Sequence, residues 1–300
     1  LQLADQDSNQ SYLGLSDADF GNDALRRYGL SELDNIATEH EQAILRYSFD
    51  VTANLSVTAT AYNNTHQRNW FKTEGIDLDG SVNADSFSGS SWASVVDAVN
   101  LGKGLGTYTH GELQGILDGN IDTAAGSVQL RSNNREYYSR GLQFGANWDG
   151  SFGGALHSVS MGLRFHEDEE DRFQRNDTYS QVAGKLGLDS LGTEGNAGNQ
   201  VQSAEALAFY IRDEISFGDW TLSPGIRFED IDQDRVRYKN GAARDFRDGR
   251  QNTAQVWLPG IGVSYQATPA FSVIGGGFSG VETVGEIKEL IDRSLIDYPN

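Results

Sequence analysis

Hydrophobic and polar residues alternate along the segment 205–228. In its first half the large apolar side chains fall on odd positions: Leu207, Phe209, Ile211, Ile215 and Phe217. In its second half they fall on even positions: Trp220, Leu222, Pro224, Ile226 and Phe228. A period of two gives a β-strand one apolar and one polar face. Only Gly218 and Asp219 separate the halves, so the segment predicts a hairpin with a tight turn.

The same alternation recurs along most of the chain. It predicts further strands at about 39–51, 55–71, 134–148, 158–166 and 256–265. Short turns are expected at 53–54, 149–154, 218–219 and 267–269. Long polar segments are expected at 73–133, 168–202 and 232–251, the first with two short helices near 91–100 and 111–117. Residues 1–38 show no clear periodicity, and they are expected to be irregular.

Short and long connections therefore alternate, which places all long loops at one end of an antiparallel up-and-down meander. Short turns at one end and long loops at the other are typical of outer-membrane barrels. Large aromatic residues gather beside the short turns, as expected of a girdle at a membrane interface: Phe49, Trp148, Phe152, Phe217, Trp220 and Tyr265. The predicted fold class is all-β, a partial transmembrane β-barrel whose apolar face meets lipid and whose polar face lines an aqueous passage.

A soluble β-barrel or sandwich with the apolar face inside is the alternative fold. Asp213 favours it, because this carboxylate falls on the apolar face, where contact with lipid would cost free energy. Pro224 and Pro259 fall in the middle of predicted strands and predict β-bulges there.

Composition narrows the function. The formal net charge of −20 argues against nucleic acid as a partner, because phosphates would be repelled. No run of about 18 apolar residues is present for a transmembrane helix. The chain has no cysteine and no histidine spacing typical of a metal site, and no catalytic arrangement is evident, so no enzyme activity and no metal are expected.

Three segments resemble a known family in order along the chain. They are Tyr12–Phe20 with Arg26–Tyr28, then Ala61–Lys72, then Leu130–Gly141. Together with the barrel pattern, residues 1–270 resemble TonB-dependent outer-membrane receptors of the ferric-citrate type. In that family a barrel encloses an N-terminal plug, loops capture a ferric chelate, and an inner-membrane energy complex drives import.

The resemblance implies a location in the outer membrane of a Gram-negative cell, with membrane lipid, a ferric chelate and the TonB-type energy complex as partners. It implies no cofactor. The plug, the energy-coupling box and the early strands of that family are not found in this sequence. The energy complex is therefore expected to act through a plug region that lies outside it.

Residues 271–300 are expected to form a separate segment. Gly275, Gly277 and Gly280 follow an apolar strand and precede a helical pattern, as in dinucleotide-binding turns. The segment resembles the motif of FAD-dependent NADH dehydrogenases, which would bind NAD or FAD. The second strand and the ribose-binding acid are missing, so the segment is interpreted as a foreign junction. An oxidoreductase fragment remains an alternative function.

Arginines are the candidate ligand-binding residues. A chelate bearing carboxylates needs cationic donors, and the arginine fork pairs with a carboxylate through two hydrogen bonds. The candidates are Arg26 and Arg27 in the first loop and, on polar strand faces, Arg46, Arg164, Arg212 and Arg227. Ion pairing with a neighbouring acid is the alternative role for each. The acidic run 167–171 is expected to be a solvated loop.

Overall fold

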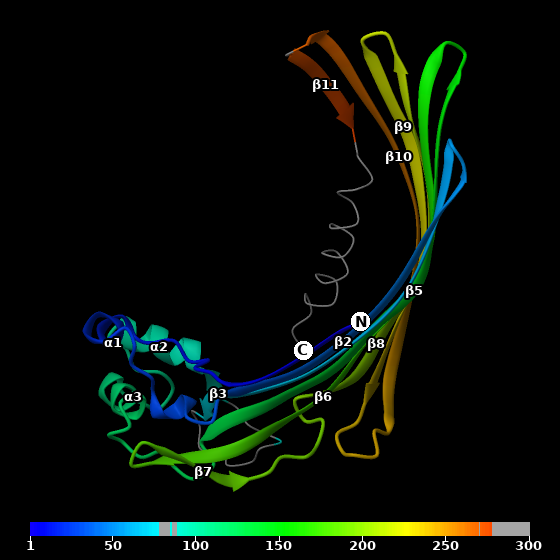
Figure 1. The fold of residues 1–300 in the computed structure, drawn as a ribbon. Coiled ribbons are helices and arrows are strands. Elements are labelled where there is room, and N and C mark those ends of the chain that lie inside the picture. Colours follow the sequence, from blue (N-terminus) through cyan, green and yellow to red (C-terminus); the bar gives the residue numbers. More distant parts are fainter. Residues whose placement is uncertain (78–84, 86–88, 270, 278–300) are drawn as a thin grey trace.

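The protein forms one open, curved antiparallel sheet (Figure 1). The computed structural model describes residues 1–77, 85, 89–269 and 271–277. The strands follow one another across the sheet in this order: β1 (Gln2–Asn9), β2 (Asn35–Thr52), β3 (Leu55–Asp77), β5 (Val128–Phe152), β6 (Ala155–Val182), β8 (Gly198–Phe217), β9 (Trp220–Tyr238), β10 (Phe246–Thr268) and β11 (Phe271–Gly277). The short strands β4 (Gly89–Ser91) and β7 (Lys185–Ser190) pair with β3 and β6.

The predicted meander and its short turns are confirmed. Gly218 in the turn between β8 and β9 has a φ of +57°, a conformation that glycine adopts without a steric penalty. Figure 1 shows the short turns at one end of the sheet and the helices at the other.

The strands run well beyond the predicted limits at the long-loop end. Residues 168–182 and 198–204 belong to β6 and β8, and only residues 239–245 separate β9 from β10. The predictions of irregular segments at 168–202 and 232–251 are therefore wrong over most of their length. The reason is that both faces of these strand extensions are polar, so no hydrophobic period marks them.

Residues 1–38 are also more regular than expected. They contain β1, the helix α1 (Asp17–Asn22) and the 3₁₀ turn η1 (Gly29–Ser31). Ser16 caps α1 by accepting a hydrogen bond from the backbone of Asp19. Strand β1 pairs with β2 over its whole length although it contains few apolar residues.

The prolines do not cause the predicted bulges. Pro259 pairs with Ile226, and Pro224 pairs with Ile261, in an unbroken register between β9 and β10. Between β8 and β9 the ladder lacks two pairs next to Pro224, but the register is the same on both sides. Proline therefore removes a hydrogen-bond donor here without adding a residue to the strand.

The apolar side chains share one face of the sheet, which we call the outer face. The register joins Tyr47, Ala59, Phe144, Leu163, Phe209, Phe228 and Trp257 in a single row across the sheet. Leu207, Phe209 and Ile226 expose 36%, 39% and 36% of their surface. The soluble alternative requires these side chains in a closed interior, and the structure contradicts it.

The predicted aromatic girdle is confirmed at the short-turn end of this face. Phe217 pairs with Trp220, and Trp220 pairs with Tyr265. The Trp220 and Tyr265 rings lie 4.6 Å apart between centroids. Phe152 and Phe49 are exposed at the same end. Exposed aromatic rings of this kind fit the interface between lipid and water.

The opposite face, which we call the inner wall, is polar and more crowded. Its residues include Thr60, Ala208 and Glu229, which expose 7%, 5% and 6% of their surface, far less than the apolar side chains of the outer face. Side chains crowd together on the concave side of a curved sheet, so the inner wall is the side that faces the lumen.

The long loops fold into a small helical cap at one end of the sheet (Figure 1). Besides α1 and η1 it contains α2 (Trp92–Asn100) and α3 (His110–Leu117), which confirm the two predicted helices. The hydrophobic core of the described residues lies here and includes Leu30, Trp92, Val95, Leu113 and Ile116. No helix in the described part of the chain has the length and apolar character needed to cross a membrane.

Candidate ligand-binding site

Arginines line up across the inner wall where the strands extend towards the cap. The register pairs Arg68 with Arg135 and Arg135 with Arg172. Gln200 follows next to Arg172, and Arg237 follows next to Gln200. We call Arg68, Arg135, Arg172 and Arg237 the arginine row. Like charges directly opposite each other destabilise a sheet, so this row costs folding free energy unless something anionic approaches it.

Acidic side chains neutralise the arginine row only in part. Glu170 lies 2.7 Å from Arg135 and 4.0 Å from Arg172 between charged atoms. Asp248 lies 2.7 Å from Arg237. Arg68 donates to the Tyr137 hydroxyl at 3.4 Å and forms no ion pair with the described acids. The Nε atoms of Arg68 and Arg172 are buried without a hydrogen-bond partner. The row therefore retains donors and positive charge for a ligand.

A hydrogen-bonded cluster lies on the inner wall between the arginine row and the short turns. The Tyr62 hydroxyl lies 2.6 Å from Nδ1 of His166, and Arg164 donates to the same hydroxyl at 3.1 Å. Nε2 of His166 lies 3.0 Å from Asp168. These bonds fix the side chains of the wall and hold polar groups where a solute could pass.

The outer face is negatively charged beyond the apolar belt, which is the band of apolar side chains that extends along β8 from Leu207 to Phe217. Its acidic residues there are Glu39, Glu41, Glu136, Glu167, Glu169, Asp171, Glu205, Asp230, Asp232 and Asp234. The prediction that 167–171 is a solvated loop is wrong, because these residues belong to β6. The net charge of −20 is thus distributed unevenly: beyond the apolar belt most outer-face charges are acidic, whereas the arginine row lies on the inner wall.

Two of the outer acids are tied to arginines. Arg140 donates to Glu167 at 2.8 Å. Arg244, in the loop between β9 and β10, donates to both carboxylate oxygens of Asp171 at 2.6 and 2.7 Å. Donating these hydrogen bonds to Asp171 raises the pKa of the Arg244 guanidinium. These pairs stiffen the outer face and do not reach the arginine row.

Arg26 and Arg27 hold the cap together. Arg26 bridges Asp19 at 2.5 Å and Asp118 at 2.7 Å, so it joins the first loop to the segment after α3. Arg27 donates to the backbone carbonyls of Gln10 and Ser31. Both guanidinium groups are therefore engaged within the protein.

Asp19 is the centre of this part of the cap. It accepts hydrogen bonds from Tyr28 at 2.5 Å and from Ser16 at 2.8 Å. Burial alone would raise the pKa of Asp19, but these hydrogen bonds and Arg26 outweigh burial and lower it. Burial and the bond to Asp19 raise the pKa of Tyr28. The cap is therefore held by a charged carboxylate.

The other predicted arginines lie on the inner wall, away from the arginine row. Arg212 pairs with Glu214 at 3.0 Å, and Arg227 forms an ion pair with Glu229. Arg46 donates to Thr60 at 3.3 Å, and Arg164 belongs to the Tyr62 cluster. The structure does not bring these residues together with Arg26 and Arg27 into one site. Their role in ligand binding stays a prediction.

The predicted glycine turn has a different structure. Gly275 and Gly277 lie in strand β11, where they pair with Val263 and Ile261. A turn that approaches a pyrophosphate requires these glycines outside a ladder, so their placement as a turn is wrong. Gly280 and the predicted helix lie outside the described residues.

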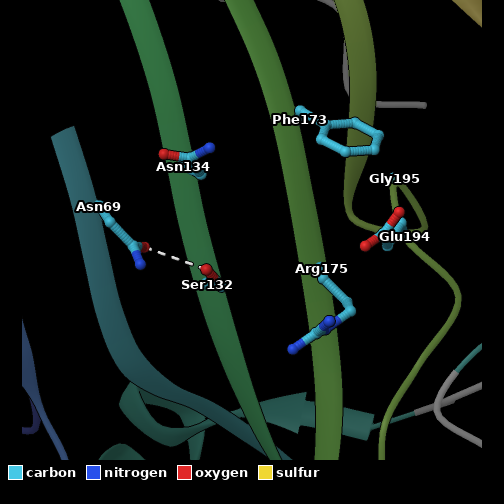
Figure 2. Close-up of a pocket in the computed structure, with 7 residues that line it drawn as sticks. All are labelled: Asn69, Ser132, Asn134, Phe173, Arg175, Glu194 and Gly195. Carbon is cyan, nitrogen blue, oxygen red and sulfur yellow. Dashed lines mark hydrogen bonds between the residues drawn. The ribbon is translucent and has the colours of Figure 1, made fainter. Parts of the chain in front are cut away.

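A recess of roughly 250 Å³ opens on the outer face near the cap (Figure 2). Figure 2 shows that its lining comes from three neighbouring strands and the loop after β7: Asn69, Ser132, Asn134, Phe173, Arg175, Glu194 and Gly195. Ser132 donates to Asn69 at 3.0 Å. The recess is smaller than usual ligand pockets and does not open onto the inner wall. We therefore place the candidate site at the arginine row.

Sequence reasoning missed the arginine row, although part of its signal was present. Phe152 pairs with Ala155 across the turn between β5 and β6. Counting back from this pair along both strands brings Arg135 opposite Arg172. This signal is useful only once both strands are known to extend that far.

Comparison with known proteins identifies the family. Residues 3–292 match the family model described as TonB dependent receptor-like, beta-barrel. The chain belongs to this family. Its members are receptors that transport their ligands and are not enzymes, and they are outer-membrane proteins of Gram-negative bacteria. The match extends past residue 271, and no comparison supports a dinucleotide-binding motif. The boundary at 271 stays a prediction.

Individual relatives agree with this assignment. The metal-pseudopaline receptor CntO of Pseudomonas aeruginosa is 31% identical over 183 residues, which cover 54% of this chain and 24% of that protein. The ferric citrate transporter FecA in its unliganded form aligns with a TM-score of 0.60 and 18% identity, over 91% of this chain and 32% of FecA. The siderophore receptor PiuA from Acinetobacter baumannii aligns with a TM-score of 0.59 and 13% identity, over 91% and 38%.

The chain spans about a quarter of the length of the curated relatives that it matches. The two solved structures share the fold. The outer face of this chain is therefore the lipid-facing surface of an outer-membrane barrel, and the inner wall faces its lumen.

Proposed function

We propose that this chain is the ligand-binding part of the wall of a receptor that captures an anionic metal chelate and imports it across the outer membrane. The arginine row carries this proposal. Carboxylates match the planar fork of arginine in geometry and charge. Positive charge on a low-dielectric wall also raises the local concentration of an anion. A ferric chelate with carboxylate groups, such as ferric citrate or another carboxylate-bearing siderophore, fits this wall.

The dimensions of the apolar belt support the membrane location. The belt extends along β8 from Leu207 to Phe217, which is ten residue steps. At a rise of about 3.3 Å per residue this is roughly 33 Å along the strand. A strand tilted by about 45° then crosses about 23 Å of membrane, close to the 25 Å apolar band of outer-membrane barrels. The arginine row lies beyond the belt, on the side of the cap.

Import requires an energy source, which this chain does not contain. We place it in an inner-membrane complex of the TonB type, acting through a plug region outside the sequence. The proposed transport needs no cofactor. The predicted oxidoreductase alternative rests on Gly275, Gly277 and Gly280 alone, and no feature of the described residues favours it.

The test uses the full-length receptor in which this chain is embedded. Arg135→Gln and Arg172→Gln, singly and together, remove the charge and the guanidinium fork but keep a polar side chain that can donate a hydrogen bond. Binding of radiolabelled ferric citrate is measured on purified receptor, and uptake is measured in cells that lack other receptors. We expect the double substitution to weaken binding by about 10²- to 10⁴-fold, because each of the two charged hydrogen bonds contributes about 1.5–3 kcal/mol.

Arg140→Gln is the matched control, because Arg140 lies five residues from Arg135 on the same strand, β5, but on the outer face. It should leave binding unchanged. Equal binding by the wild type and the double variant would refute the role of the arginine row. A neutral or cationic chelate that binds as tightly as the anionic one would refute the proposed ligand class.

A further inference from the structure

Two histidines face each other across adjacent strands of the inner wall. His40 on β2 pairs directly with His66 on β3. Their ring centroids lie 5.8 Å apart, with an angle of 60° between the rings. The Tyr137 ring lies 5.7 Å from His66 on the other side. The pair lies one row from the arginine row, since Thr38 and Arg68 form the next inward-facing pair on these strands.

The two imidazoles are available as ligands. Both residues are half-buried, and neither ring hydrogen-bonds to a described side chain. A metal-binding histidine commonly donates one ring N–H to a carbonyl, which orients the ring and leaves the other nitrogen for the metal. The backbone of Glu39 lies close enough to the His66 ring to take this role.

The spacing of the rings fits a shared metal ion. A Zn–N distance of about 2.0–2.1 Å places a ring centroid about 3.2 Å from the metal. Two such rings at a tetrahedral angle have centroids about 5.2 Å apart, by the same geometry. The observed centroid distance is 5.8 Å, so the two rings already lie close to the separation that a shared ion requires.

We propose that His40 and His66 form a two-imidazole site for a divalent transition-metal ion on the lumen side of the receptor. Within the described residues no group of three or more histidine, aspartate or glutamate side chains could hold a metal ion. The remaining coordination positions are therefore filled by water or by the oxygen and nitrogen atoms of a chelator. Imidazole favours Zn²⁺, Ni²⁺ and Cu²⁺ over Mg²⁺ and Ca²⁺.

This site extends the proposed function, on which its biological meaning rests. The arginine row would bind the carboxylates of a chelate, and the histidine pair would bind the metal of the same complex directly. A chelate that leaves positions of its metal open would then be held at both ends. A chelate that fills all coordination positions of its metal would gain nothing from His40 and His66.

The experiment measures binding of the metal alone to the purified, tag-free full-length receptor in detergent. Zn²⁺ affinity is measured by calorimetry, and the electron paramagnetic resonance spectrum is recorded with Cu²⁺. The variants are His40→Ala, His66→Ala and the double variant. His110→Ala is the control, because His110 lies on α3 in the cap and is exposed. Two measurements check that each variant is folded: its Trp fluorescence, and the difference in gel migration between the unheated and the heated protein.

We expect one Zn²⁺ to bind at this site and either single substitution to weaken it by roughly 10²-fold, because the two ligands act as one linked pair. The Cu²⁺ spectrum should show two nitrogen ligands in the wild type and one in each single variant. Unchanged Zn²⁺ affinity in the folded double variant would overturn the proposal.

The outcomes separate this proposal from the proposed function. If the double histidine variant loses Zn²⁺ but the Arg135→Gln/Arg172→Gln variant keeps it, the metal site is independent of the arginine row. If the wild type binds the anionic chelate but no free metal, the histidine site is refuted and the proposed function stands. If the receptor binds the metal but no chelate, the proposed function fails and the metal site remains.

Discussion

The pair of His157 and Asp213 offers a sharp test of the membrane assignment. Both side chains belong to the outer face, and His157 Nδ1 lies 2.7 Å from Asp213 Oδ2. Asp213 lies four residues from Phe217 in the aromatic girdle, which is about 13 Å along the strand. At a tilt of about 45° this places the carboxylate roughly 9 Å inside the apolar belt. His157 therefore supplies the hydrogen bond that lipid cannot supply.

Removing His157 should leave a carboxylate unpaired in the hydrocarbon. The side chains of His157 and Asp213 expose only 17% and 25% of their surface even without lipid, and Oδ1 of Asp213 already lacks a hydrogen-bond partner. Breaking a buried pair costs about 3–5 kcal/mol. Partial exposure at this depth reduces the cost, so we expect His157→Leu to lower the free energy of unfolding by about 2–3 kcal/mol.

The double variant His157→Leu/Asp213→Leu should restore stability, because an apolar pair suits lipid better than a hydrogen-bonded one. The assay is equilibrium unfolding in urea of the full-length receptor, folded into lipid vesicles and followed by Trp fluorescence. The midpoint should fall in the single variant and return in the double variant. A double variant less stable than His157→Leu would refute the lipid-facing position of Asp213.

Two further predictions concern the cap and the inner wall. Asp19 has a lowered pKa in the folded protein, so the stability it gives to the cap is complete above its unfolded pKa of about 3.9 and is lost as the pH falls through its folded pKa. Hydrogen exchange of the α1 amides, corrected for intrinsic rates, should therefore rise in the wild type as the pH falls below about 4. In Asp19→Asn exchange should be fast at neutral pH, and the exposed Asp17→Asn should behave as the wild type. On the inner wall, a Cβ at Gly141 would clash with the Phe165 carbonyl oxygen and the Tyr62 hydroxyl. Gly141→Ala should thus lower the free energy of unfolding in urea by about 1–3 kcal/mol. Gly145→Ala, on the same strand with no close neighbour, should not, and equal effects of the two would contradict the crowding of Tyr62 and His166.

The strands that cross the membrane could be predicted from the sequence, because lipid on one side and water on the other impose a period of two. Leu207 to Phe217 shows this pattern, and its hairpin is found where the alternation ends at Gly218. The same strands beyond the membrane have water on both sides. The run Glu167–Asp171 carries no apolar residue, so nothing in its pattern distinguishes a strand from a loop.

The arrangement of the candidate site could be predicted only in part. The turn between β5 and β6 fixes the pairing of Arg135 with Arg172, because the register there is unbroken. The turn between β2 and β3 does not fix the pairing of His40 with His66 in the same way. Thr52 pairs with Leu55, but a register shift follows between Asp50 and Thr52. Counting from the turn would bring His40 opposite Gln67, and a slip of one residue moves a side chain to the other face.

The register decides which charges face the lumen. On β6 the outer face carries only acids in this stretch, Glu167, Glu169 and Asp171, whereas Arg172 faces the inner wall together with Asp168 and Glu170. A slip of one residue would turn the acids of the neighbouring strands into the lumen and the arginines outwards. An anion would then be repelled where it is now attracted. Because the turns and the apolar belt fix the register, the lipid-facing pattern also determines where the arginine row lies. One register therefore determines both which side chains contact lipid and which arginines face the lumen.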